Sequence, residues 1–292
     1  MLCTDYLYAV PKIEVTMSNA NSYLDIIHES NKAMLDEVDR ICKAHDIRYF
    51  LHGGTLLGAA RHKDFIPWDD DIDIIMQRTE YEKLKAVFSK EADARFSLLL
   101  DDGYDNFFDY ISKIADTSVT YARTAYGNED FYEGRFSHPT LDFFVLDNVG
   151  KGHKWQLIRL KLIYAMSMGH RRRVDYGKFK GGMKAIAFIL SKIGKLIPYK
   201  LLASSYHKIS KEVKSLDESE YYFISNEQPH PHYWGLLFPK KWFDGQIYLS
   251  IRGDKYPASS FYDDWLTMVY GDWRSLPPSD MQRPMHVCEI EK

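Results

Sequence analysis

Four aspartates crowd into the short segment Trp68–Asp73, which reads Trp-Asp-Asp-Asp-Ile-Asp. Asp71 and Asp73 are two residues apart, and the β-branched apolar run that follows them is typical of a buried strand. Alternate residues of a strand point to one face, so this spacing predicts that the two carboxylates project together. Neighbouring carboxylates repel each other, and a hard cation that prefers oxygen ligands removes that cost. An acidic surface turn is the alternative, because charge runs are usually solvated.

A glycine pair precedes the aspartates. The segment 47–52 is expected to be a strand, and it leads to Gly53, Gly54, Thr55 and a short apolar helix. Glycines at a strand-to-helix junction let the backbone approach a ligand closely, and the first N–H groups of a helix attract an anion. Thr55 suits a helix cap or a phosphate contact. The order strand, glycine turn, helix and acidic strand is that of the nucleotidyltransferase fold, in which the turn holds phosphates and the carboxylates hold a metal.

A further carboxylate, Asp142, stands alone in the apolar segment 140–146. A buried carboxylate is costly unless it is paired or bound to a metal. Asp142 is therefore a candidate third ligand on a neighbouring strand. A partly exposed aspartate with a structural use is the alternative.

Two stretches resemble the LicD family of phosphotransferases more closely than fold alone would require. They are His52–His62, which reads His-Gly-Gly-Thr-Leu-Leu-Gly-Ala-Ala-Arg-His, and Phe65–Asp73. The resemblance resumes at 140–144 and at 270–278, and the middle of the chain carries little of it. It implies transfer of phosphocholine from CDP-choline to a sugar of a bacterial surface glycan. The fukutin-related proteins, which transfer ribitol phosphate from CDP-ribitol, are similar at the same motif.

The resemblance also implies roles for single residues. The residues expected to hold one or two Mg²⁺ or Mn²⁺ ions and to carry catalysis are Asp71, Asp73 and Asp142. The residues expected to contact substrate are Gly53, Gly54, Thr55, Arg61, Lys113, Asp69, Arg283 and His286. Among these, Arg61 and Lys113 are expected to offset charge on the leaving CMP. For Lys113, an exposed edge-strand lysine is an equally good explanation.

The expected fold is α+β, with a nucleotidyltransferase-like mixed sheet, flanking helices and a helical insert. Residues 1–150 are expected to form the catalytic core, 151–220 the mainly helical insert, and 221–292 a segment that completes the core. Periodicity predicts the longer helices at 18–45, 79–90, 154–168, 183–197, 201–216 and 261–270. The basic insert could rest on an anionic membrane or hold a lipid-linked acceptor, although a solvated helical insert is the simpler explanation.

Composition limits the possible classes of function. A formal net charge of −3 over 292 residues argues against a general nucleic-acid binder. The three cysteines are widely spaced and form neither a zinc pattern nor a disulfide framework, which favours a reducing cytoplasm. No secretory signal or transmembrane run is recognisable, so a cytoplasmic, possibly membrane-associated location is expected.

The function predicted from the sequence is metal-dependent transfer of an alcohol phosphate from a CDP-alcohol, with CDP-choline favoured. The acceptor would be a hydroxyl of a glycan such as lipopolysaccharide or teichoic acid, or of its lipid-linked precursor, and CMP would be released. Three rivals stay open: a nucleotidyltransferase that releases pyrophosphate, an Asp-x-Asp glycosyltransferase, and a non-catalytic protein that binds nucleotide or glycan. The glycosyltransferase would leave the glycine turn and Asp142 unused.

Overall fold

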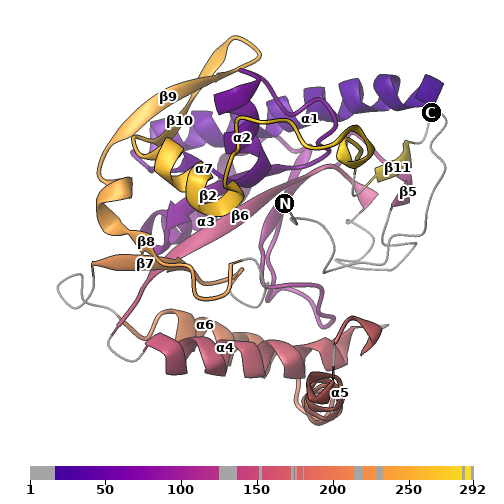
Figure 1. Ribbon diagram of the computed structural model, residues 1–292, viewed down its shortest axis with the longest axis vertical. Helices are drawn as coiled ribbons and strands as arrows, with labels where there is room; N and C mark the ends of the chain where they lie inside the picture. The colour runs from indigo at the N-terminus through magenta and orange to yellow at the C-terminus, as the bar shows by residue number, and fades with distance from the viewer. Residues whose placement is uncertain are drawn as a thin grey trace. The chain divides into compact units, whose positions relative to one another are not determined.

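The computed structural model describes residues 17–124, 137–150, 153–171, 174, 176–179, 181–213, 220–227, 233–284 and 287–290 (Figure 1). The chain divides into two compact units, each assembled from segments that are not consecutive. Unit 1 comprises Met1–Leu98, Lys113–Phe144 and Lys241–Lys292, and unit 2 comprises Leu99–Ser112 and Val145–Lys240. The insert expected over 151–220 thus lies within unit 2, and the segment that carries the aspartates lies in unit 1.

Unit 1 contains a sheet with helices on both faces. Its helices are α1 (Met17–Ala44), α2 (Gly53–Arg61), α3 (Arg78–Glu91), α7 (Tyr262–Tyr270) and the short 3-10 helix η6 (Ser279–Met281). Its strands are β1 (Phe50–Leu51), β2 (Ile72–Gln77), β3 (Phe96–Leu99), β4 (Lys113–Asp116), β5 (Tyr121–Thr124), β9 (Gln246–Ile251), β10 (Asp254–Ser259), β11 (Val287–Ile290) and most of β6 (Thr140–Asn148). The strand order is β1-β2-β6-β4-β3, while β9 pairs with β10 and β5 with β11. Helices around a sheet confirm the α+β class in general.

Two adjacent residues of β6 show how the helices cover the sheet. Neighbouring residues of a strand point to opposite faces. Phe143 contacts the ring of Tyr81 on α3, at 6.1 Å between ring centroids. Phe144 contacts the ring of His52, which directly precedes α2, at 4.6 Å, and His52 in turn lies 5.3 Å from Trp265 on α7. Helix α3 therefore covers one face of the sheet, and the start of α2 and α7 cover the other.

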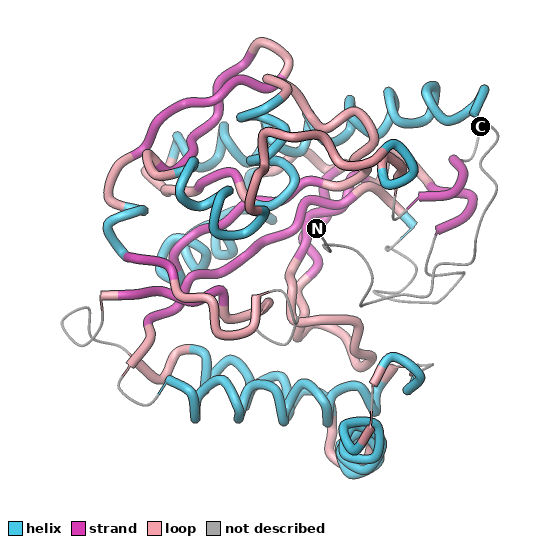
Figure 2. The backbone as a smooth tube through the Cα atoms, in the orientation of Figure 1, coloured by secondary structure: helices cyan, strands magenta, loops and turns pink. Residues whose placement is uncertain are grey.

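Unit 2 is mainly helical. It contains α4 (His153–Ser167), α5 (Gly182–Gly194), α6 (Tyr199–Ser210) and the short elements η2 (Met168–His170), η3 (Tyr176–Lys178), β7 (Tyr221–Ile224) and β8 (Phe238–Pro239). The last residues of β6 pair with β7, and β7 pairs with β8. Buried aromatic rings form much of its core, including Tyr110 stacked on Tyr206 at 3.7 Å. Figure 2 shows the helical character of this part of the chain. Among the described residues, no helix is both long and apolar enough to cross a bilayer.

The helices follow the sequence expectations closely, whereas two strands do not. The strand expected over 47–52 is only two residues long. The apolar residues of 108–114 also predict a strand, and this prediction is wrong for residues 108–112, because β4 begins at Lys113. Phe107 and Tyr110 pack in the buried core of unit 2 and do not belong to a strand. Helix α7 ends at Gly271, whose φ of 69° suits glycine.

Candidate active site

Three consecutive aspartates form a compact acidic group just before β2. One carboxylate oxygen from each of Asp69, Asp70 and Asp71 can be chosen so that all lie within 4.8 Å of one another. Asp70 is buried, and the other two are half-buried. Strand β2 begins at Ile72, so Asp71 belongs with the preceding loop and Asp73 with the strand. A set of close carboxylate oxygens without His or Cys is the donor chemistry that suits Mg²⁺ or Mn²⁺.

The glycine pair is explained by two of these carboxylates. A Cβ atom on Gly53 would lie 2.3 Å from Oδ2 of Asp73, and a Cβ atom on Gly54 would lie 2.3 Å from Oδ2 of Asp69. Gly53 also has a positive φ of 51°, which favours glycine. The first turn of α2 therefore carries no side chain where the carboxylates approach its backbone. The positive end of the helix dipole stabilises negative charge at this place.

Two hydrogen bonds join the start of α2 to β2. The backbone N–H of His52 donates to the carbonyl of Asp73 at 3.1 Å. The backbone N–H of Asp73 donates to Oγ1 of the buried Thr55 at 2.8 Å. Thr55 thus positions the acidic strand relative to the glycine turn, which is a role additional to the expected phosphate contact.

The expected third carboxylate pairs with the expected phosphate contact. Lys113 and Asp142 are direct partners in the antiparallel register of β4 and β6. Nζ of the buried Lys113 donates to Oδ2 of Asp142, and Thr140 Oγ1 donates to Oδ1 at 3.2 Å. Asp142 precedes Phe144 by two residues, so both point to the face on which His52 lies. The structure therefore brings Lys113 and Asp142 together as an ion pair on the face that holds the start of α2.

Helix α1 supports the acidic loop from behind. Nε2 of His28 donates a hydrogen bond to the backbone carbonyl of Asp69 at 2.8 Å. Its ring lies 5.2 Å from the ring of Phe65. Burial lowers the pKa of His28, so the imidazole is neutral near pH 7 with its proton on Nε2. Nothing in the local sequence indicates this role, because His28 and Asp69 are 41 residues apart.

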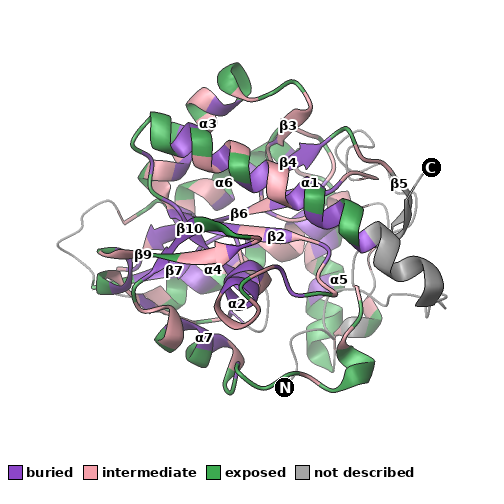
Figure 3. Cartoon of the chain, turned by 90° about the horizontal axis from the view of Figure 1, so that it is seen from above, coloured by how far each residue is buried: buried purple, intermediate pink, exposed green. Residues whose placement is uncertain are grey.

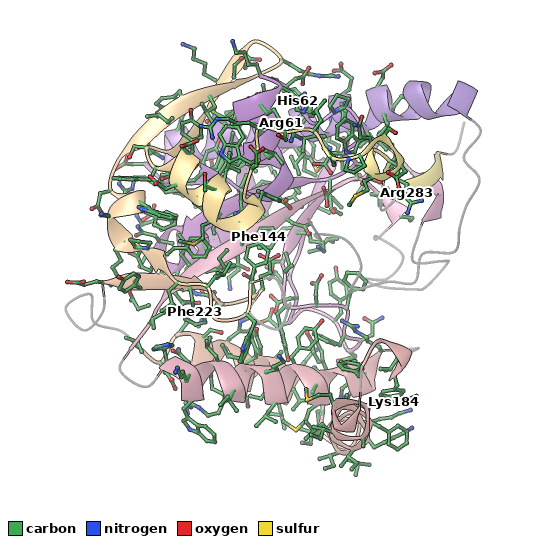
Figure 4. The ribbon with its side chains drawn as sticks, viewed as in Figure 1. Arg61, His62, Phe144, Lys184, Phe223 and Arg283 are labelled. Carbon is green, nitrogen blue, oxygen red and sulfur yellow. The ribbon has the colours of Figure 1, made fainter. Side chains whose placement is uncertain are left out.

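Two of the remaining expected contacts, Arg61 and Arg283, lie at the edges of this arrangement. Arg61, at the end of α2, donates from Nη1 to the carbonyls of Trp273 and Ser275 at 3.0 and 3.1 Å. It thereby fastens the segment after α7 to α2. Arg283 is exposed and follows η6, apart from Arg61 in Figure 4. His286 lies outside the described residues.

Two residues beyond the expected set join the site. Asp70 completes the group of three carboxylates and is the most buried of them. His52 is fully buried, and desolvation lowers the pKa of its imidazole to about 3, so the ring stays neutral. Asp70 could have been included from its place in the aspartate run. The packing of His52 between Phe144 and Trp265 depends on residues far away in the sequence.

A family model described as LicD/FKTN/FKRP, nucleotidyltransferase domain, matches residues 46–146. That range contains the glycine turn, the acidic loop and the Lys113–Asp142 pair. The lipopolysaccharide cholinephosphotransferase LicD of Haemophilus influenzae is 31% identical over 271 residues, covering 88% of this chain and 93% of that protein. Similarity over nearly the whole length of both proteins shows that this chain belongs to the LicD family.

A second group of relatives is similar only over a short stretch. The ribitol 5-phosphate transferases FKRP of Homo sapiens and Mus musculus are each 59% identical over 34 residues. This match covers 12% of the present chain and 7% of each relative. The likeness to FKRP is therefore local, while the likeness to LicD extends along the chain.

Proposed function

We propose that this protein transfers phosphocholine from CDP-choline to a sugar hydroxyl of lipopolysaccharide or of a related surface glycan, releasing CMP. The full-length similarity to a lipopolysaccharide cholinephosphotransferase carries this proposal. The catalytic domain would be of the nucleotidyltransferase-like type. In the reaction, the acceptor oxygen forms a bond to the distal phosphorus of the donor, and the bond from that phosphorus to the CMP oxygen breaks.

The proposed metal ligands come from the acidic loop and the start of β2. Asp69, Asp70, Asp71 and Asp73 offer oxygen atoms beside the glycine turn, which fits one or two Mg²⁺ or Mn²⁺ ions. A bound divalent cation would neutralise charge on the donor diphosphate. The glycine turn would let these carboxylates, and a cation held by them, lie close to the start of α2.

The Lys113–Asp142 pair has a separate proposed role on the same face. Charge spreads over phosphoryl oxygens in the transition state, so a fixed cation near the donor lowers its energy. Lys113 is buried and forms an ion pair with Asp142. In the proposed complex, its ammonium group would also attract a phosphate oxygen of the donor. Asp142 is the proposed acceptor of the proton that leaves the sugar hydroxyl, or a further metal ligand.

A nucleotidyltransferase reaction is the second candidate, because the matching family model carries that description. In that reaction a nucleotide would be transferred from CTP and pyrophosphate would leave. The same carboxylates and glycine turn would serve both reactions. Only the identity of the products separates them.

Product analysis tests the proposal. The protein is incubated with Mg²⁺, a lipopolysaccharide acceptor and, in parallel, CDP-choline, CDP-ribitol or CTP, and the products are identified by mass spectrometry. We expect CMP and an acceptor heavier by one phosphocholine, with no pyrophosphate from CTP. An acceptor that gains ribitol phosphate, a whole nucleotide or a bare sugar would overturn the substrate assignment. The Asp73→Asn variant and a chelator provide the negative controls.

Donor binding without acceptor gives an independent readout. A ligand that binds the folded state alone stabilises it by about 3 kcal/mol at a concentration a hundred times its dissociation constant. We expect CDP-choline to raise the melting temperature in the presence of Mg²⁺, and less so after chelation. Equal shifts with and without metal would argue against a metal-bound diphosphate.

A further inference from the structure

Helix α5 of unit 2 buries its small residues. Its buried positions are Ala187, Ser191 and Gly194, which recur at four- and three-residue spacing and so share one face. A Cβ atom on Gly194 would lie 2.0 Å from the carbonyl oxygen of Met166 on α4. A Cβ atom on Gly169 would lie 2.0 Å from the carbonyl oxygen of Ser191. The helix is therefore packed backbone to backbone, with little room for large side chains on this face.

The large apolar side chains of α5 point away from that contact. Those that remain 46–56% exposed are Met183, Ile186, Phe188, Ile189 and Ile193. Ile186, Ile189 and Ile193 follow helical spacing and so form one outward stripe. Much of α5 is coloured as exposed in Figure 3. A helix in water normally buries its large apolar residues. Helix α5 does the opposite, because it buries small residues and exposes large apolar ones.

The neighbouring helix α4 also carries exposed apolar residues. Helix α4 packs against both α5 and α6 within unit 2. On α4, Trp155, Ile158 and Leu162 are exposed and share one face by their spacing. Exposed apolar residues scattered singly are ordinary, but a run of them along adjacent helices marks an interaction surface.

The segment that contains α5 and α6 carries only positive charges over a long stretch of sequence. Between residues 178 and 211 the sequence has no aspartate or glutamate, and its lysines are Lys178, Lys180, Lys184, Lys192, Lys195, Lys200, Lys208 and Lys211. Lys184, Lys192 and Lys195 are exposed on or just after α5. Lys184 is labelled on this helix in Figure 4. Nζ of Lys192 lies 5.4 Å from the ring centroid of Phe188, so apolar and basic groups are interleaved.

We propose that this surface, made of the outward face of α5 and the exposed face of α4, docks on an anionic lipid bilayer. The isoleucines would enter the boundary between head groups and acyl chains, while the lysines would meet anionic head groups. A second copy of this chain is a poorer partner, because a symmetric contact would place the same lysines against each other. The inference concerns unit 2 and does not rest on the transfer reaction.

Vesicle binding tests the proposal with the intact protein. Co-sedimentation is measured with phosphatidylcholine vesicles and with vesicles that also contain phosphatidylglycerol, at low and high salt. We expect binding to the anionic vesicles only, weakened by salt because the charges at the surface are screened. The double variant Ile189→Ser/Ile193→Ser should bind at least about tenfold more weakly, because apolar area is lost.

A lysine variant separates the charge contribution. Lys184→Gln/Lys192→Gln/Lys195→Gln should weaken binding to anionic vesicles on the order of a hundredfold, since each lysine near the surface contributes several-fold. All three positions are exposed, so the helix should still fold, which circular dichroism checks. The matched controls are Ile26→Ser and Lys90→Gln, which change an exposed isoleucine and an exposed lysine in unit 1. Neither control should alter vesicle binding.

Three results would overturn the proposal. The first is no binding of the wild-type protein to anionic vesicles at low salt. The second is equal loss of binding in the α5 variants and the controls. The third is a wild-type dimer in sedimentation velocity that Ile189→Ser/Ile193→Ser converts to a monomer, because a second copy would then be the partner.

Discussion

The carboxylates of Asp71 and Asp73 can be changed in charge without a change in size. We expect Asp71→Asn and Asp73→Asn each to lower the rate of CMP release by more than about a hundredfold, because each removes a proposed metal ligand. The melting temperature of the metal-free protein should be unchanged or higher, since repulsion among crowded carboxylates is relieved. Asp280→Asn, at an exposed position, is the control. Near-normal rates for either variant would remove that residue from the site.

Because Asp142 forms a buried ion pair with Lys113, its substitution should affect stability as well as activity. Removing one partner of a buried ion pair destabilises a protein by roughly 3–5 kcal/mol, because the other charge stays buried. We expect Asp142→Asn to lower the free energy of unfolding by about this amount, in addition to reducing activity. The double variant Lys113→Met/Asp142→Leu should recover most of the stability but no activity. Denaturant unfolding measures both, and an Asp142→Asn protein as stable as wild type would contradict the pairing.

Gly54 allows the position of Asp69 to be tested without touching the carboxylate. In Gly54→Ala the new methyl group would displace the Asp69 side chain, which can move because it is the end of a flexible group. Alanine favours a helix by about 1 kcal/mol relative to glycine, so the protein should fold well. We expect activity to fall by about tenfold or more while the melting temperature holds. Gly58→Ala is the contrast, because its methyl group would meet the backbone of the 64–66 loop and should destabilise the fold.

Helix α1 positions the acidic loop through the hydrogen bond from His28 to the Asp69 carbonyl. We expect His28→Leu to weaken the apparent affinity for Mn²⁺ about tenfold, because the hydrogen bond to the Asp69 carbonyl is lost. His28→Gln can still present an N–H donor and should recover part of the affinity. Titration with Mn²⁺, followed by electron paramagnetic resonance, measures this. His45→Leu, an exposed position near the end of the same helix, should have no effect. A merely structural role would leave the glutamine variant as weak as the leucine variant.

The sequence predicts the bounds of the helices, but it does not predict which helix faces are buried or which residues pair across strands. Residue spacing was enough to place α1, α3, α4 and α5 to within a few positions, because helical periodicity is a local signal. It could not indicate that α5 buries Ala187 and Ser191, because the same period describes either face. The partner of Lys113 lies across the sheet and 29 residues away, so its ion pair depends on strand register. The acidic loop and the glycine turn were recognisable because their residues adjoin in the sequence.

The buried His52 makes the free energy of unfolding of the protein depend on pH. Burial lowers the pKa of the folded state to about 3, while an unfolded histidine titrates near 6.5. The unfolded chain therefore binds a proton that the folded protein does not, and stability decreases as the pH falls from 6.5 toward 3. We expect a loss of roughly 1 kcal/mol per pH unit from this residue. Denaturant unfolding of chelated protein from neutral pH to about pH 4 should show a shallower slope for His52→Leu. Identical slopes for the wild-type protein and the variant would contradict a lowered pKa of His52 in the folded state.

The interleaved order of the two units has a consequence for synthesis on the ribosome. Unit 2 is enclosed between segments of unit 1, whose last part begins at Lys241. Gln246 reaches back to the carbonyl of Tyr49, and Arg61 to that of Trp273, a separation of 212 residues. Pairings between distant segments form late, because a long loop must first close. The helices of unit 2 can therefore assemble while translation continues, but the site on α2 gains its final supports only when the C-terminal segment arrives. Until synthesis ends, unit 1 would therefore remain incomplete, and chaperones would encounter this unit rather than the helices of unit 2.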